Sequence, residues 1–514
     1  MKKLIINIIA IALISIISAC EVTELEPVNV LSEDLAFATP KNIELSMVGV
    51  YDAAQSGFFL GAETNNRGYI FGAAHIQQGD MRGEDMLLIN IFYAFTYQAT
   101  YTSTTANNVN YWENGFRLIN LCNLFIEGVH NAVESNIISE EAGDAYEAEA
   151  RVLRAITYHT LVIHFARPYR DGNGSSPGLP IFESGVNSAD EVELVVNTSR
   201  STVAEVYDFI LEDLDYAEQY AITNEDYPIT RASQGAAIAL KSRIYLHMGD
   251  WQNVITEANK LITSGQYVLG SSVETPWNDN ESSESIFSME MSPTDNLNTN
   301  AALARMLGSP SLGARGEYAI SPIIWNQSFW HSDDLRRTLL VEDNGMRYFT
   351  SKYRDYGQWT DYSPIIRYAE VILNLAEAEG RQNGITPIGL AHLNSIRDRA
   401  ISGNMVSYTM ADFPNATTFI QSVLNERRIE LLAEGHRWSD IHRNAVEPDF
   451  TAGGIPAKMI SSQVTDLSVY TIGTPPTDFG INAIPYNDFR FLWPIPDSET
   501  SRNPTLLEQQ NPGY

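Results

Sequence analysis

Carboxylates are the residues of this sequence whose type and spacing could do chemistry. Two carboxyl groups about 5 to 9 Å apart are enough to hydrolyse a glycosidic bond, and the chain holds 64 Asp and Glu among 514 residues. Two segments with helical periodicity carry candidate pairs: Glu377 and Glu379 in NLAEAEG, and Glu426 and Glu430 in NERRIELLAEGHRWSDIHR (425–443). Arginines accompany both pairs, and ion pairs between helices are the commoner use of such a pattern. We therefore expect 425–443 to be a structural helix whose arginines bind carboxylates on neighbouring helices.

No stronger signature of catalysis or metal binding stands in the sequence. The HExxH and CxxC spacings of zinc sites are absent. His159 and His164 fall on one predicted helix, but five residues apart they do not share a face. We therefore predict no enzyme, no catalytic residue, no cofactor and no metal ligand. The acidic composition leaves open an incidental calcium ion.

Aromatic residues in loops are the better candidates for binding. Sugars present apolar C–H faces, and exposed rings supply flat contact area at low entropic cost. Trp112 and Trp251 recur at helical spacing and are expected to be core residues. Rings in non-periodic segments, with two polar neighbours, form the predicted ligand site: Asp80, Arg82, Phe92, Tyr93, Tyr97, Trp325, Trp330, Tyr356 and Trp359.

The N-terminus predicts export. Two lysines precede an apolar run over 4–17, and Ser18-Ala19-Cys20 follows. This pattern indicates a signal peptide over 1–19, and the Cys in this position resembles a bacterial lipobox, with Cys20 as the lipidated residue of the mature chain. An ordinary signal peptide is the alternative. Once Cys20 is lipidated, Cys122 is the only thiol, so the fold must form without an intrachain disulfide.

Net charge limits the possible partners, and hydrophobic periodicity predicts the architecture. A net charge of −31, spread along the chain, argues against nucleic-acid partners. After a tether over 20–40, we predict one body over 41–514 that is mainly α-helical. About four tetratricopeptide-like helix pairs pack against a loop-rich irregular subdomain. The predicted helical scaffold comprises about 41–55, 110–264 and 364–445, and the loop-rich, ligand-facing insertions are about 56–109 and 265–363.

Several segments resemble the SusD/RagB family of outer-membrane nutrient-binding lipoproteins. They are the lipobox at Cys20 and, in order, AEARVLRAITYHTLVIHF (148–165), STVAEVYDFILEDLDYAE (201–218), the helices of 231–269, IIRYAEVILNLAEAE (365–379), LNSIRDRA (393–400), NERRIELLAEGHRWSDIHR (425–443), LWPIP (492–496) and QNPGY (510–514). Together they span most of residues 20–514.

This resemblance implies a surface-exposed, lipid-anchored protein of the Gram-negative outer membrane. It implies a partner, a SusC-type TonB-dependent transporter, over which the protein acts as a lid. The expected ligand is an oligosaccharide, bound without catalysis on an aromatic surface that differs between members. Oligopeptide capture on the same architecture, a surface glycosidase and a helical-repeat scaffold for protein partners are the alternatives.

Overall fold

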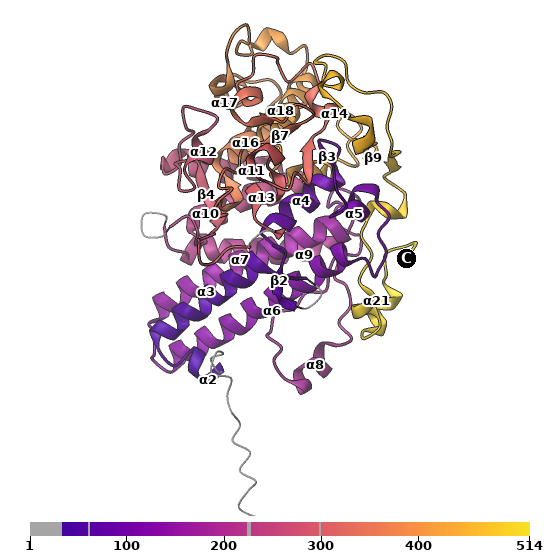
Figure 1. Cartoon of the computed structure of the whole chain (residues 1–514). Helices are drawn as coiled ribbons and strands as arrows, with labels where there is room; N and C mark the ends of the chain where they lie inside the picture. The colour runs from indigo at the N-terminus through magenta and orange to yellow at the C-terminus, as the bar shows by residue number, and fades with distance from the viewer. Residues whose placement is uncertain (1–32, 60–61, 224–227, 298–299) are drawn as a thin grey trace, which may run out of the picture.

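The computed structural model describes residues 33–59, 62–223, 228–297 and 300–514. The predicted signal peptide, the lipidation site at Cys20 and most of the tether lie outside the described residues. From the first described helix the chain runs through a helical half into a mixed half and ends beside the helical half (Figure 1).

Three long helices form the first layer, and they lie side by side in Figure 1. Thr39 accepts a hydrogen bond from the backbone of Asn42, and Pro40 occupies the first turn, where its missing N–H costs nothing. Ser139 caps the third helix, with Glu140 and Glu141 in the first turn. The elements of this part are α2 (Glu33–Ala36), α3 (Pro40–Ser56), α6 (Ala106–Glu134) and α7 (Glu140–Phe165).

The remaining helices continue the stack. Successive long helices pack against one another: α6 against α7, α7 against α9, α9 against α10, α10 against α11, α11 against α16, and α16 against α17 and α18. Their bounds are α8 (Ala189–Val195), α9 (Val203–Tyr220), α10 (Gln234–Met248), α11 (Trp251–Ser264), α16 (Tyr368–Asn383), α17 (Pro387–Arg397), α18 (Ala416–Glu430) and α19 (His436–Arg443). The predicted mainly α-helical, tetratricopeptide-like fold is confirmed.

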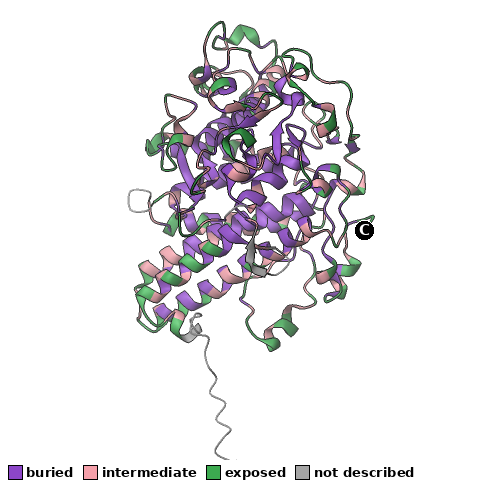
Figure 2. Cartoon of the chain, in the orientation of Figure 1, coloured by how far each residue is buried: buried purple, intermediate pink, exposed green. Residues whose placement is uncertain are grey.

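Short elements and loops make up the mixed half. Its strands form two-stranded antiparallel sheets, of which β4–β8 and β3–β5 are the most buried. The strands are β1 (Phe58–Phe59), β2 (Ala62–Asn66), β3 (Met86–Leu88), β4 (Ser285–Met289), β5 (Tyr318–Ile320), β6 (Val341–Asp343), β7 (Tyr348–Thr350), β8 (Ser363–Arg367), β9 (Gly454–Ile455) and β10 (Ile484–Pro485). The short helices are α4 (Ala73–Arg82), α5 (Ala94–Gln98), α12 (Thr275–Asn278), α13 (Leu303–Leu307), α14 (Pro322–Trp325), α15 (Arg336–Leu339), α20 (Asp497–Thr500) and α21 (Pro504–Glu508). Figure 2 shows buried ribbon through the centre of the molecule, and exposed ribbon at α8 and at the outer ends of the long helices.

Two of the predicted helices differ from the observed ones. The helix expected from Pro364 begins at Tyr368, because 363–367 pairs as β8 with β4. The stretch 425–443 is not one helix: α18 ends at Glu430, and a turn with Ala433 and Gly435 at positive φ leads into α19. A Cβ on Gly79 of α4 would lie 2.0 Å from the carbonyl oxygen of Gly435. The helix breaks where α4 packs directly against this backbone.

The segment 56–109 is therefore only partly a loop-rich insertion. Its helix α4 is buried along almost its whole length and packs on α19. The pairing of β3 with β5 also ties this segment to the mixed half. Residues expected to face a ligand on this segment are thus drawn into the scaffold.

The end of the chain closes on the long helices. The Trp493 indole stacks on the His164 ring, with centroids 4.2 Å apart. The buried Arg200 guanidinium donates to the carbonyl oxygens of Gly178 and Gln509 and to Asn511 Oδ1. LWPIP and Asn511 of QNPGY, two segments of the family resemblance, therefore make buried contacts that hold the C-terminal segment against the long helices.

Candidate ligand-binding site

The loop 355–361 is organised by two of its own carboxylates. Asp355 accepts hydrogen bonds from the backbone N–H groups of Gly357 (3.1 Å), Gln358 (2.8 Å) and Thr360 (3.1 Å), and from the Thr360 hydroxyl (2.5 Å). Asp361 accepts from the backbone N–H of Asp355 at 2.9 Å. These bonds fix the loop without help from a sheet or helix, as short Asp side chains do in turns.

The turn holds Trp359 in a backbone conformation that side chains avoid. Its φ is +61°, and the left-handed region costs a residue other than glycine about 1–2 kcal/mol. The Asp355 bonds on both sides of Trp359 offset this cost. Such local strain concentrates at functional sites, and here it presents a half-buried indole at the loop tip.

Two further rings lie beside this loop. Trp277 and Tyr362 line a shallow cleft with room for about 20 Å³. Asn280 joins them to the loop, because its amide donates to Thr360 O (3.0 Å) and its Oδ1 accepts from the Tyr362 backbone (3.3 Å). A cleft of this size holds about one water molecule. The cleft between these rings is therefore too small to enclose a sugar.

Helix α13 links these rings to Phe92. The Tyr356 ring packs against Gly308 at the end of α13, where a Cβ would lie 2.4 Å from Tyr356 Cε1. On the loop after α13, the Arg315 guanidinium lies 4.7 Å from the centroid of Phe92. We call this set the aromatic loop face: Phe92, Trp277, Tyr356, Trp359 and Tyr362. It includes the three predicted site residues that stay partly exposed.

The structure corrects the role of the other six predicted site residues. Their exposed fractions are between 0 and 6%, so their side chains have no surface to offer a ligand. They are Asp80, Arg82, Tyr93, Tyr97, Trp325 and Trp330. Their segments lack long periodicity, but the loops are folded inward around them.

Asp80 and Arg82 are buried by the packing of α4. Asp80 accepts a hydrogen bond from the Gly435 backbone at 3.2 Å, and burial raises the pKa of its carboxyl well above the usual range. The Arg82 guanidinium lies 3.4 Å from the Trp438 ring and 5.1 Å from the Trp493 ring. Burial lowers the pKa of Arg82 to about 10. Both side chains stabilise contacts between α4, α19 and the C-terminal segment.

The four buried rings also have packing partners. Tyr93 packs against Tyr318, and the Tyr97 hydroxyl donates to Met459 O at 2.7 Å. Trp325 stacks on Tyr348 with centroids 3.9 Å apart, and Arg337 lies over both Trp325 and Trp330. These four rings are therefore core residues.

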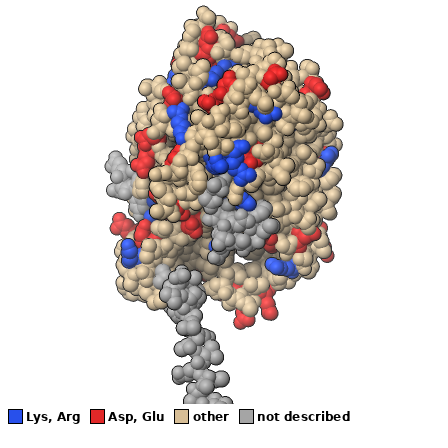
Figure 3. All heavy atoms as spheres, in the orientation of Figure 1, with Lys and Arg blue, Asp and Glu red and all other residues tan. Residues whose placement is uncertain are grey.

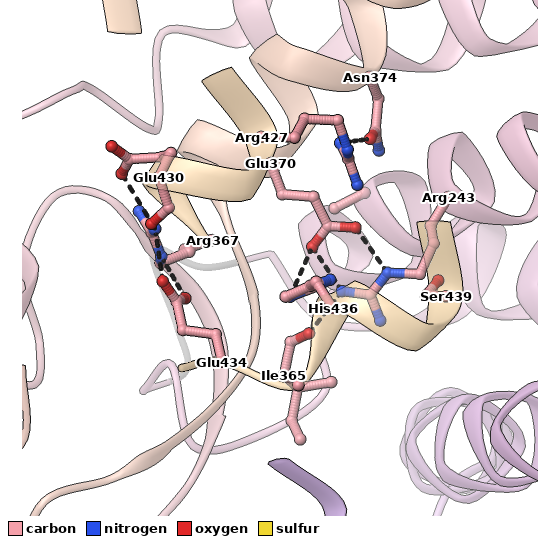
Figure 4. Close-up of polar contacts among 12 residues, drawn as sticks. Arg243, Ile365, Arg367, Glu370, Asn374, Arg427, Glu430, Glu434, His436 and Ser439 are labelled. Carbon is pink, nitrogen blue, oxygen red and sulfur yellow. Dashed lines mark hydrogen bonds and ion pairs between the residues drawn. The ribbon is translucent and has the colours of Figure 1, made fainter. Parts of the chain in front are cut away.

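The glutamates of 425–443 sit in a buried network of charges. Figure 4 shows Glu430 and Glu434 converging on Arg367. Arg367 Nε lies 2.7 Å from Glu434, Lys352 Nζ lies 2.6 Å from the same carboxylate, and all three side chains are at most 5% exposed. The predicted binding of this stretch's arginines to carboxylates on other helices is confirmed for Arg443, which binds Glu377 of α16, whereas Arg428 and Arg437 bind Glu84 and Asp85 on the loop after α4. The network around Glu430 and Glu434 extends to Glu284, Asp334, Arg336 and Arg399.

Two other candidate acids, Glu377 and Glu426, are also buried and paired with arginines. Burial alone would raise the pKa of Glu377, but Arg443 (2.7 Å) and Arg381 (2.9 Å) outweigh it and hold the pKa at about 2. A general acid needs a raised pKa. Burial does raise the pKa of Glu426, with Arg336 opposing, yet its side chain is 2% exposed and binds Arg336 at 2.6 Å. A substrate has no access to it.

Glu377→Gln is expected to lower stability in a pH-dependent way. The folded pKa of Glu377 lies below the unfolded value of about 4.3. Its carboxylate therefore stabilises the fold above pH 4.3, and this contribution is lost as pH falls toward 2. Urea unfolding at pH 7 and pH 3 should give a loss of about 3–5 kcal/mol at pH 7 and a smaller one at pH 3.

The control is Glu212→Gln, at an exposed position of α9, with an expected change within about 0.5 kcal/mol. An equal loss at both pH values would contradict the ion-pair explanation.

The most apolar large cavity lies elsewhere. A pocket of about 250 Å³ lies between α6, α8 and α21. Its lining includes the apolar Trp112, Phe116, Ile119, Phe182, Val192 and Leu506 and the polar Asn120, Glu499, Arg502 and Asn503. Apolar side chains dominate this lining, which suits a ligand more apolar than an oligosaccharide. We therefore place the candidate site on the aromatic loop face.

Sequence reasoning missed Trp277 and Tyr362 as site residues. Trp277 follows a Thr-Pro pair, and Tyr362 stands just before β8. The Asp-Tyr-Gly of 355–357 is a turn signal that could have located the loop. The contact with Asn280, 80 residues away from the loop, has no local signal.

Two family models match the chain. The model described as "SusD family" matches residues 343–514, and the one described as "Starch-binding associating with outer membrane" matches 58–246. The first covers Lys352, Arg367, Glu430 and Glu434 of the charge network and the closing segments, and the second covers α4 to α9 and most of α10. The chain is a SusD-like protein. In the described part of this SusD-like protein, none of the helices has both the length and the apolar character needed to cross a membrane.

Individual relatives agree with this assignment. SusD-like protein P2 of Formosa agariphila is 22% identical over 100% of both chains. A crystal structure of a SusD superfamily protein from Bacteroides fragilis superposes with a TM-score of 0.74 at 25% identity, covering 91% of this chain and 99% of that one. Surface glycan-binding protein A from Bacteroides uniformis shares the fold, with a TM-score of 0.68 at 18% identity over 92% of this chain and 99% of that one.

Proposed function

We propose that this SusD-like protein captures oligosaccharide at the cell surface and delivers it to a TonB-dependent transporter of the SusC type. Lipidation at Cys20 would anchor it to the outer membrane, and 20–40 would serve as the tether. The family description and the names of its relatives, starch-binding and surface glycan-binding, support the ligand class. No catalytic step belongs to the proposal.

The observation that carries the proposal is the presentation of Trp359. Asp355 accepts four hydrogen bonds that hold the backbone of this loop, including the positive φ of Trp359, and they place the indole at the loop tip. A pyranose offers an apolar face to such a ring and hydroxyls to polar neighbours. Asn280 and the loop backbone lie beside the rings as hydrogen-bonding groups.

Delivery requires that ligand change the balance between two states. A lid favours its closed position over the transporter only as far as the ligand binds better to the closed state. An open aromatic surface suits this role, because a ligand held on one side keeps its other side free for the transporter. We therefore propose that the aromatic loop face is turned toward the transporter.

Isothermal titration of residues 21–514 tests ligand class. We expect binding to at least one member of a panel of neutral and acidic oligosaccharides, and none to a matched panel of oligopeptides. Binding to peptides with silence toward every oligosaccharide would overturn the sugar proposal and favour peptide uptake. Incubation of the bound sugar with the protein should release no shorter product.

A further inference from the structure

Basic side chains gather on the aromatic loop face of a protein whose net charge is −31. Figure 3 shows blue side chains grouped near the middle of the visible face, over the position that α13 has in Figure 1. Arg305 belongs to α13, and Arg315 follows it on the loop that leads to β5. Both are partly exposed.

Arg315 combines a ring contact with a fixed guanidinium. It lies over Phe92 at 4.7 Å from the centroid, and Arg67 lies over the same ring at 5.3 Å. Its Nη1 donates to Asn300 Oδ1 at 2.6 Å, and its Nε donates to Glu317 at 2.9 Å. The Arg315 side chain is 30% exposed and that of Glu317 is 2% exposed. The cation of this pair is therefore exposed to solvent, and the carboxylate is buried.

Arg305 adds a second cation beside the first. Its Nη1 donates to the Gly313 carbonyl, and its backbone carbonyl accepts from the Arg315 N–H at 2.8 Å. Among the side chains that the structure describes, no carboxylate forms an ion pair with Arg305. The exposed charge of this patch is thus positive.

From this patch we infer that the ligand is an anionic oligosaccharide, whose carboxylate or sulfate ester groups contact Arg305 and Arg315 while a sugar ring packs on Phe92. This inference rests on the proposed function. Guanidinium groups bind carboxylates and sulfates through paired N–H donors. A neutral glycan needs no cations here, whereas an anionic glycan is repelled by the protein as a whole and needs a local positive site.

Titrations with pairs of oligosaccharides that share a backbone and differ in charge test the inference. The probes are oligogalacturonates with their methyl esters and sulfated galactan oligosaccharides with their desulfated forms. We expect at least ten-fold tighter binding of an acid or sulfate ester than of its neutral counterpart. The pair that shows the difference identifies which anionic group is bound.

Variants then assign the effect to the patch. Arg305→Gln should abolish most of that preference while leaving affinity for the neutral form unchanged. Arg315→Lys keeps the positive charge beside the buried Glu317. This variant should lose part of the preference for the anionic ligand. Arg490→Gln, which removes a 39% exposed arginine paired with Asp488, is the control and should change nothing.

The possible outcomes separate this inference from the proposed function. Equal affinity for acidic and neutral partners, binding of neutral sugars only, or full preference retained in Arg305→Gln would overturn the inference and leave sugar capture standing. Silence toward every oligosaccharide would overturn both.

Discussion

Glu434→Ala is expected to destabilise the protein by about 3–5 kcal/mol, because it removes the shared partner of two buried cations. Arg367 Nε and Lys352 Nζ lie 2.7 and 2.6 Å from this carboxylate, and both cationic side chains are at most 5% exposed. Burial by itself would raise the pKa of Glu434, but Arg367 and Lys352 lower it. The carboxylate is therefore charged at neutral pH. Its loss leaves Lys352 without an ion pair among the described residues, whereas Arg367 keeps Glu430 and Glu284.

Urea unfolding at pH 7, followed by circular dichroism, measures this loss. Adding Lys352→Met to Glu434→Ala should recover part of the stability, because the cation that has lost its carboxylate partner is then removed. The surface pair Arg490–Asp488 supplies the control, and Arg490→Ala should cost less than about 1 kcal/mol. A cost below 1 kcal/mol for Glu434→Ala would show that the buried network does not hold the scaffold together.

The helical scaffold could be predicted because its signals are local. Ser139 and Thr202 cap α7 and α9, and Gly249 ends α10 in a left-handed conformation, each within a few residues of the element it bounds. The charges of 425–443 were also interpretable, since arginines and glutamates at helical spacing predict ion pairs. The partners of Glu434, which are Arg367 on β8 and Lys352, could not be predicted, because each lies more than 60 residues away from it in the sequence.

The site was harder to predict because exposure is a tertiary property. Trp330 and Trp359 both stand in non-periodic sequence, yet Trp330 is 1% exposed beneath Arg337, and Trp359 lies at a loop tip. Asp80 and Arg82 look like polar loop residues, but α4 packs them against α19. The turn residues 355–357 mark the loop of Trp359, but the sequence around Asp80, Arg82 and Trp330 carries no local signal of their burial.

Trp359→Ala is expected to weaken oligosaccharide binding by ten-fold or more while leaving the fold intact. Burying one large apolar side chain against a ligand contributes about 1.5–3 kcal/mol, and 1.4 kcal/mol corresponds to ten-fold in Kd. The Asp355 bonds go to backbone groups and Thr360, so the loop does not depend on the indole. The melting temperature should therefore stay close to that of the wild type.

Trp330→Ala is the matched control, because the same substitution removes a buried ring. It should lower stability by about 3–5 kcal/mol and leave the affinity of the folded protein unchanged. Isothermal titration of wild type, Trp359→Ala and Trp330→Ala with the tightest-binding oligosaccharide tests the location of the site most directly. The proposed aromatic loop face predicts lost affinity only in Trp359→Ala, and unchanged affinity in that variant would contradict it.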